Sequence, residues 1–176
     1  LLVKKGDSVK NGTPLFFDKK NQEALFVSSC SGTIQDIVFG SRRIVERIEI
    51  DNDKKNESET LGYDVTKDNL LKSGLWTYLR QKPYSKIPHY LSTPKSIFIS
   101  AIPTEPFALK NTFLFDQFKY LQKGVDSLRE IFDCPINISV SDSTFSSLNN
   151  VNFYSFNPLH PAGNVGIQIH HIDPIK

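Results

Sequence analysis

The chain has 176 residues, of which 39% are hydrophobic and 23% charged, a composition that is typical of a folded domain and excludes a disordered protein. Its formal net charge of +2, from 21 basic and 19 acidic residues, offers no strong field for nucleic acid. No apolar run approaches the roughly 20 residues that cross a bilayer. Methionine is absent even from position 1, which predicts a fragment, and the isolated Cys30 and Cys134 are expected to be free thiols.

The first fifty residues are predicted to form a small barrel or sandwich of short strands. Glycine turns recur at short intervals, beginning with the strong turn signal Asn11-Gly12. Residues 42–50 nearly alternate, which predicts a half-buried strand. One face of that strand should carry Ile44, Ile48 and Ile50 and the other Arg43, Arg47 and Glu49, with Val45 as the exception.

A lysine pair in this region raises the possibility of a carrier module. The pattern V-K-K-G-D-x-V-x-x-G-x-P-L, followed by S-G-T-I, resembles the lipoyl/biotinyl-like barrel-sandwich hybrid, whose carrier members display a modified lysine at a hairpin tip. Lys19 and Lys20 lie near that position. The alternative is a surface lysine pair on a polar hairpin, which the absence of a neighbouring methionine favours.

A polar stretch and a helical pattern follow. Residues 51–60 are entirely polar, which indicates a loop. We therefore predict a β region at residues 1–52, a linker at 53–62 and an α/β region at 63–176. A helix capped by Asp64 or Thr66 is expected to run to Pro83, with Gly74 interrupting it at about 1 kcal/mol relative to alanine. Its apolar stripe would consist of Leu70, Leu71, Leu75, Tyr78 and Leu79.

The following residues are predicted to form a Rossmann-like α/β arrangement. The expected order is a strand at 96–102, a helix at 115–132, a strand at 135–140, a short helix capped by Asp142 or Ser143, and a strand at 151–156. Such alternation implies a parallel sheet. The turn after the first strand, residues 103–107, has two prolines, a glutamate and no glycine. We infer that this sheet does not bind a dinucleotide in the usual way.

The last stretch, residues 157–174, carries three histidines and an aspartate. A metal site is disfavoured because His170 and His171 are adjacent and point apart on a strand or a helix, and no H-x-x-x-H or C-x-x-C motif supports one. The favoured interpretation is a glycine-adapted turn. A further one is that Gly163 and Gly166 allow close approach of a ligand or partner. The chain also lacks the G-x-S-x-G, P-loop and H-E-x-x-H motifs.

Taken together, five segments resemble one family, the A subunits of the sodium-translocating NADH:quinone oxidoreductases. They read G-D-S-V-K-N-G-T-P-L-F-F-D-K-K-N, S-G-T-I, S-R-R-I-V, S-G-L-W-T-Y-L-R-Q-K-P-Y-S-K-I-P and H-P-A-G-N-V-G-I-Q-I-H-H-I-D-P. The resemblance spans nearly the whole chain, and the tryptophan and H-P-A-G segments are the specific ones. Relatives generally have Thr at Ile167 and an aromatic at His171, which makes a chemical role for that stretch harder to assert.

The resemblance implies a peripheral, non-redox subunit on the cytoplasmic face of the bacterial inner membrane. Its partners would be the other members of a six-subunit translocase that uses NADH, FAD, FMN, iron–sulfur and ubiquinone, with no cofactor, metal or catalytic residue in this fragment. In flavin-binding relatives the segment at 74–83 is a glycine-rich loop along the phosphate. Here the bulky residues 77–83 would fill that space.

Three hypotheses therefore stay open. The first is the non-redox subunit, supporting electron transfer from NADH to ubiquinone coupled to Na⁺ export. Its expected quinone or partner contacts are Trp76, Arg80, His160, Gly163 and His170. The second is a flavin- or NADH-binding subunit of a complex I or Rnf type, and the third is the lipoyl/biotinyl-like carrier.

Overall fold

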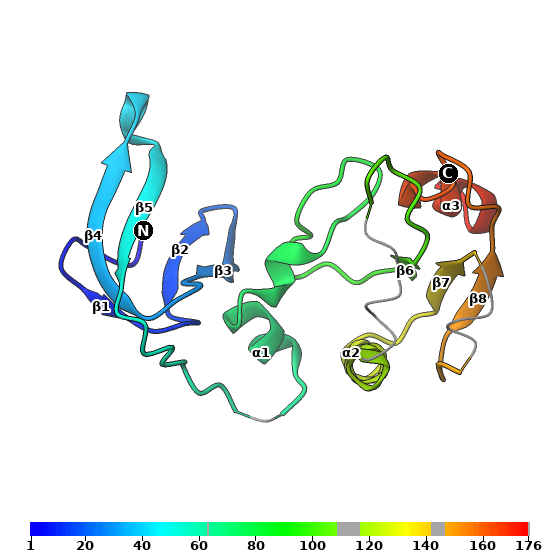
Figure 1. The fold of residues 1–176 in the computed structure, drawn as a ribbon, viewed down its shortest axis with the longest axis horizontal. Coiled ribbons are helices and arrows are strands. Elements are labelled where there is room, and N and C mark those ends of the chain that lie inside the picture. Colours follow the sequence, from blue (N-terminus) through cyan, green and yellow to red (C-terminus); the bar gives the residue numbers. More distant parts are fainter. Residues whose placement is uncertain (63, 109–116, 142–146, 176) are drawn as a thin grey trace. The chain divides into compact units, whose positions relative to one another are not determined.

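The computed structural model describes residues 1–176 except 63, 109–116, 142–146 and 176. The chain forms two compact units, Leu1–Ser92 and Thr93–Lys176, here called the N-terminal and C-terminal units. Figure 1 shows antiparallel ribbons in the first and a helix beside parallel strands in the second. None of the described helices is both long enough and apolar enough to cross a membrane.

The N-terminal unit is built from two small antiparallel sheets. One has the order β1 (Ser8–Val9), β4 (Gly32–Phe39), β5 (Val45–Asn52), and the other pairs β2 (Pro14–Asp18) with β3 (Asn21–Val27). The first half of β4 alternates buried and exposed residues, as expected of a strand with one face on the core. That core consists of Val9, Leu15 and Ile34, with Val3, Phe16, Ile37, Ile48 and Ile50 packed against it.

The strand predicted at 42–50 is confirmed in part. Ile48 and Ile50 pack on the core, but Ile44 is 61% exposed, so its predicted place on the buried face was wrong. The 3-10 turn η1 (Ser41–Arg43) ends just before Ile44, and β5 begins just after Ile44, at Val45. A register irregularity between Val38 and Phe39 accompanies this turn, and the alternation therefore starts only after it.

The predicted long helix is shorter than its apolar stripe indicated. α1 (Lys67–Lys72) begins with the predicted cap, where Thr66 Oγ1 accepts a hydrogen bond from the Asn69 N–H. It ends before Gly74, whose φ of 78° lies in the left-handed region. The 3-10 helix η2 (Leu75–Tyr78) follows. The stripe across Gly74 was therefore a wrong prediction, because left-handed backbone stops an α-helix.

Both α1 and η2 contact β3, so residues up to Ser92 belong by contacts to the N-terminal unit. The domain boundary predicted in the linker at residues 53–62 stays a prediction.

The C-terminal unit contains the predicted parallel sheet. Its order is β6 (Ile97–Ser100), β7 (Ile136–Val140), β8 (Asn152–Ser155), and α2 (Phe118–Ile131) lies between the first two in sequence. The predicted strands and the long helix are confirmed, while Phe115 and the caps Asp142 and Ser143 lie outside the described residues. The central strand β7 is buried at every position. The core joins Ala101, Ile138, Val140 and Leu148, with Ile99, Phe118, Leu121 and Val151 around it.

The last element corrects another prediction. Residues predicted to form a turn form the helix α3 (Val165–Ile172), whose N-cap Asn164 accepts a hydrogen bond from the Gly166 N–H at 2.9 Å. Asparagine at this position satisfies a free backbone donor of the first turn. Gly163 and Gly166, close to Asn164 in sequence, are residues typical of a turn. The side-chain cap of Asn164 instead begins a helix here.

Candidate functional site

Trp76 is the centre of the packing in the segment that the sequence singled out. Its side chain is 1% exposed, and its indole N–H donates to the Pro88 carbonyl at 2.7 Å. The same carbonyl accepts from Asn21 Nδ2 at 2.9 Å, and Asn21 Oδ1 accepts from the Tyr90 N–H at 2.9 Å. This network ties the segment after α1 to the start of β3.

Gly74 brings the backbone of this segment close to the same hairpin. A Cβ built on Gly74 would lie 2.8 Å from Val27 Cγ2, so a side chain there would push against the Val27 side chain of β3. Trp76 thus serves as a buried anchor of the N-terminal unit, with Lys67 Nζ 5.2 Å from its ring centroid.

Arg80 and Trp76 lie in different environments. It is exposed, and its Nη1 donates to the carbonyls of Thr77 at 2.5 Å and Leu79 at 2.8 Å. The guanidinium therefore closes its own turn. Trp76 points into the unit and Arg80 lies on its surface, so these two predicted contact residues do not form one cavity.

Gly163 lies where the chain after β8 meets the carboxyl end of β6. Its N–H donates to Thr104 Oγ1 at 3.1 Å, and its carbonyl accepts from Ser100 Oγ at 2.9 Å. A Cβ on Gly163 would lie 2.5 Å from the Ile102 carbonyl oxygen and would also collide with Thr104 Oγ1. The close approach seen at Gly163 is therefore to residues of its own unit, and the predicted approach of a ligand or partner stays a prediction.

Gln168 fixes α3 to the same place, although no sequence motif marks it. The side chain is fully buried, and its Nε2 donates to Ser100 Oγ and to the Ala162 carbonyl, both at 2.8 Å. Two neighbouring polar atoms, Gln168 Oε1 and Ser139 Oγ, are buried without a hydrogen-bond partner among the described residues. A glutamine in an apolar segment is the only sequence hint of this network.

An apolar pocket of about 460 Å³ opens beyond the end of β8. It is lined by Phe156, Asn157, Leu159, Pro161, Ala162, Ile167 and His171. Its position follows the carboxyl end of a parallel strand, where open α/β sheets bind ligands. His171 lies 6.4 Å from Phe156, ring centroid to ring centroid. The pocket therefore combines an apolar wall with one imidazole.

The predicted histidines lie around this pocket rather than in its lining. His160 and His170 are exposed, and the ring of His170 meets that of His171 at 5.4 Å and 77°. His171 was absent from the predicted contacts. Its position four residues after Ile167 places both on one helix face, so recognising α3 as a helix would have selected it.

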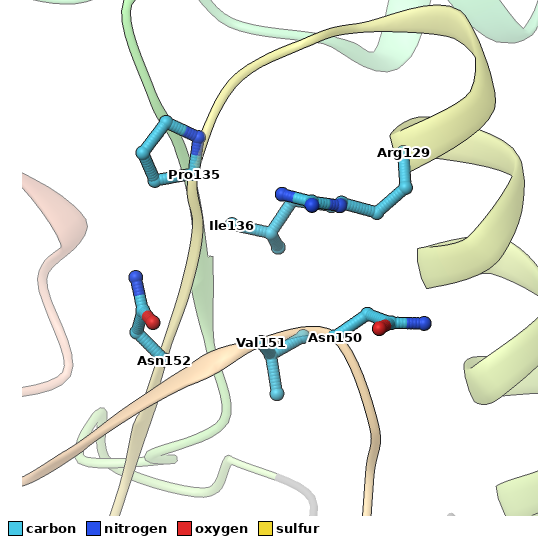
Figure 2. Close-up of a pocket in the computed structure, with 6 residues that line it drawn as sticks. All are labelled: Arg129, Pro135, Ile136, Asn150, Val151 and Asn152. Carbon is cyan, nitrogen blue, oxygen red and sulfur yellow. The ribbon is translucent and has the colours of Figure 1, made fainter.

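A second pocket, of about 370 Å³, lies at the opposite edge of the sheet (Figure 2). It is lined by Arg129, Pro135, Ile136, Asn150, Val151 and Asn152. Arg129 extends from α2 towards the amino ends of β7 and β8 (Figure 2), and its Nη1 donates to the Cys134 carbonyl at 3.2 Å. Because α/β sheets bind ligands at the carboxyl ends of their strands, we regard this pocket as the weaker candidate.

Metal and thiol chemistry find no support in the described parts of the chain. No three His, Cys, Asp or Glu side chains gather there as a metal site. Cys30 and Cys134 are free, as predicted. Burial raises the pKa of the Cys134 thiol, with Asp133 adding to it and Arg129 opposing it, so less reactive thiolate is present at neutral pH.

Lys19 and Lys20 form the turn between β2 and β3 and are exposed. Their place at a hairpin tip is the one predicted for a carrier lysine. Modification of either residue stays a prediction.

Comparison with known proteins identifies both regions. Residues 1–53 match the family model of the NqrA N-terminal barrel-sandwich hybrid domain, and residues 61–176 match that of the NqrA second alpha/beta domain. The predicted fold class, a barrel-sandwich hybrid followed by an α/β region, is confirmed.

Curated relatives align with nearly the whole chain. Among them are the Na(+)-translocating NADH-quinone reductase A subunits of Haemophilus influenzae (strain PittGG), 36% identical over 98% of this chain, and of Marinomonas sp. (strain MWYL1), 34% identical over 100%. The chain spans 42% of the length of each. The chain therefore belongs to the NqrA family, the A subunits of the Na(+)-translocating NADH-quinone reductases.

Proposed function

We propose that this chain is part of a non-redox, peripheral subunit of a sodium-translocating NADH:quinone reductase. In this role it sits on the cytoplasmic face of the membrane and docks on the other subunits. It supports electron transfer from NADH to ubiquinone coupled to Na⁺ export, while NADH, flavins and iron–sulfur groups bind elsewhere in the complex. The family membership supports the assignment to the complex.

The filled segment after α1 is the observation that carries the non-redox role. A phosphate cradle needs bare backbone N–H groups that a ligand can approach. In this segment the indole of Trp76 is buried against the N-terminal unit and Arg80 is bonded to the carbonyls of its own turn. The two side chains therefore occupy the space and the backbone carbonyls of this segment with contacts inside the protein, which supports a structural role.

The test is the flavin content of the full-length subunit together with its effect on the complex. We expect the purified subunit to be colourless and to release no FMN on denaturation. Bacterial membranes lacking the subunit should lose NADH-driven Na⁺ transport and regain it when the gene is restored. Stoichiometric FMN bound beside residues 74–83 would contradict the non-redox role and favour the flavoprotein alternative.

The apolar pocket beyond β8 supports a second element of the proposal, a quinone contact. Apolar walls suit a quinone ring, and an imidazole N–H of His171 can donate to a quinone carbonyl oxygen. Neighbouring Phe156 and Ile167 supply the apolar surface. The contact predicted from sequence is thereby moved from His160 and His170 to His171.

Photo-crosslinking of a quinone analogue to the intact complex tests this contact. Labelled peptides should include residues 156–171, and His171→Phe, which keeps the ring but removes the donor, should weaken labelling. His160→Phe is the matched control because His160 is exposed outside the lining. Labels confined to other segments, or equal effects of the two variants, would reject the contact.

The carrier alternative is tested separately by the intact mass of the protein from native cells. An unmodified mass removes a lipoyl or biotinyl group on Lys19 or Lys20. A mass increase on either residue would support it.

A further inference from the structure

An uninterrupted absence of carboxylates distinguishes one stretch of the chain. Residues 69–104 contain no Asp or Glu. Within the N-terminal unit this stretch carries Lys72, Arg80, Lys82 and Lys86. Lys72 is paired with Asp68 at 2.7 Å, but none of the ion pairs among the described residues includes the other three. The charged side chains that this stretch contributes to the N-terminal unit are therefore all basic, while Asp68 and Glu23 act on Lys72 at its start.

The centre of this stretch is a closed loop, residues 81–86, which we call the tyrosine loop. The Gln81 N–H donates to the Lys86 carbonyl at 2.7 Å and closes it. Tyr84 lies in the turn and is 79% exposed. Lys86 Nζ lies 5.5 Å from the Tyr84 ring centroid. The loop thus presents one aromatic ring with the Lys86 side chain beside it, and it carries a second lysine, Lys82.

The tyrosine loop is held at its base. The bonds of Trp76 and Asn21 to the Pro88 carbonyl secure the chain just after it, and Arg80 secures the turn just before it. Figure 1 shows the segment after η2 as an extended loop without a strand or helix of its own. Its exposed ring is therefore presented by an anchored base.

Further exposed apolar side chains flank the loop in sequence. Tyr78 is 79% exposed, Leu75 56% and Leu91 70%. Single exposed apolar residues are common, but a group within one short segment marks a surface for binding. Arg80 is already bonded to two carbonyls, and Lys82 Nζ donates to Ser85 Oγ within the loop at 2.8 Å. Because an ammonium has three N–H donors, Lys82 and Lys86 both keep donors for a ligand.

We propose that the tyrosine loop docks on an anionic lipid surface, with Tyr84 at the headgroup level and Lys82 and Lys86 beside lipid phosphates. Tyrosine is enriched at membrane–water interfaces, where its ring is apolar and its hydroxyl is hydrated. Lysine places its stem along apolar groups and its ammonium at the phosphates. The loop itself carries no carboxylate that would repel an anionic surface.

The size of the loop favours lipid over a protein partner. A stable protein interface takes roughly 20–30 residues from each partner, whereas the tyrosine loop, residues 81–86, has six. A bilayer surface needs no shape complementarity and accepts a narrow tip. Surrounding subunits stay the alternative, and the experiment separates the two.

Co-sedimentation of the full-length protein with lipid vesicles tests the proposal. Vesicles of phosphatidylglycerol and phosphatidylcholine should bind it, and vesicles of phosphatidylcholine alone should bind it much less. The double variant Lys82→Ala/Lys86→Ala should weaken binding roughly twenty-five-fold, about fivefold for each lysine. Its control is Lys19→Ala/Lys20→Ala, which removes the same charge from an exposed hairpin tip.

The contribution of the Tyr84 ring is tested by a matched pair of variants. Tyr84→Ser should also weaken binding, whereas Tyr120→Ser should not, although Tyr120 is 56% exposed and has Lys119 Nζ 4.9 Å from its ring centroid. Equal losses in the two lysine pairs would show diffuse charge attraction and overturn the proposal. Absence of binding to anionic vesicles, with cross-links from position 84 reaching another subunit, would overturn it in favour of a protein partner.

Discussion

The two units solve the burial of a sheet in different ways. In the N-terminal unit the first half of β4 alternates buried and exposed residues, so one face meets a core and the other meets solvent. In the C-terminal unit β7 lies between two parallel strands and is buried at every position. Antiparallel hairpins tolerate a wet face, whereas a central parallel strand is covered on both.

The units also differ in how they treat buried amides. Asn21 in the N-terminal unit donates to Pro88 and accepts from Tyr90. Gln168 in the C-terminal unit uses its Nε2 twice, but its Oε1 has no partner among the described residues. A buried unpaired oxygen costs stability, so the polar network of the C-terminal unit is the less complete of the two.

The largest expected loss of stability is in the N-terminal unit. Trp76→Ala should lower the free energy of unfolding by about 3–5 kcal/mol, because it leaves a cavity and frees the Pro88 carbonyl from one donor. Urea denaturation followed by circular dichroism measures it. Tyr78→Ala, at a position 79% exposed, should stay within about 0.5 kcal/mol. Similar losses in both variants would mean that Trp76 is not the anchor.

The corresponding test in the C-terminal unit is Ile138→Ala. Ile138 is fully buried in the middle of β7, and its truncation should cost about 2–5 kcal/mol. Ile138→Val, which removes one methylene, should cost about 0.5–1.5 kcal/mol. Chemical denaturation of both variants measures the two losses in the free energy of unfolding. A loss for Ile138→Ala below that of the valine variant would show that β7 is not the covered centre of this unit.

A pair of glycines separates steric from conformational effects within the same unit. Gly163→Ala should cost about 1–3 kcal/mol, because the added Cβ meets the Ile102 carbonyl oxygen at 2.5 Å. Gly124→Ala, in α2 with nothing within 4 Å of its Cβ, should instead stabilise by about 0.5–1 kcal/mol. Thermal unfolding measures both. A neutral or stabilising Gly163→Ala would contradict the close approach at Gly163.

Sequence patterns predicted elements well where periodicity and burial agree. β6 was predicted from a short apolar run between two prolines, and α2 from apolar residues that keep to one helix face. The stripe through Gly74 failed because side-chain spacing carries no information on a left-handed φ. Helix α3 was missed because its cap, Asn164, lies among glycines that favour a turn.

The candidate site was less predictable than the fold. The histidines were predicted as contacts by residue type alone. His171 lines the pocket because it lies on the pocket-facing side of α3, a helix that the sequence did not indicate. Gln168 could not be found at all, since its role depends on Ser100, which is 68 residues away in the chain. Local patterns predict elements, whereas contacts between distant segments decide which side chains meet.

The smallest expected effect concerns a charge at the end of β5 and depends on pH. Asp53 Oδ1 accepts from Ser31 Oγ at 2.6 Å and from the Lys55 N–H at 3.0 Å. The Ser31 hydroxyl first, and the Lys55 amide second, lower the pKa of Asp53 below its ordinary 3.8. Since the folded pKa is the lower one, the stabilisation is present above that ordinary value and is lost as the pH falls through the folded pKa.

Asp53→Asn should therefore lower the melting temperature slightly near pH 7, and the difference from the unmodified protein should shrink at about pH 3. Asp51→Asn is the matched control, because it makes the same charge change two residues away on β5, while the Ser31 and Lys55 hydrogen bonds go to Asp53. Melting curves across this pH range decide the point. If the Asp53 difference were constant with pH, the effect would come from packing rather than from the charge, and the hydrogen bond from the buried Ser31 would not distinguish the carboxylate from an amide.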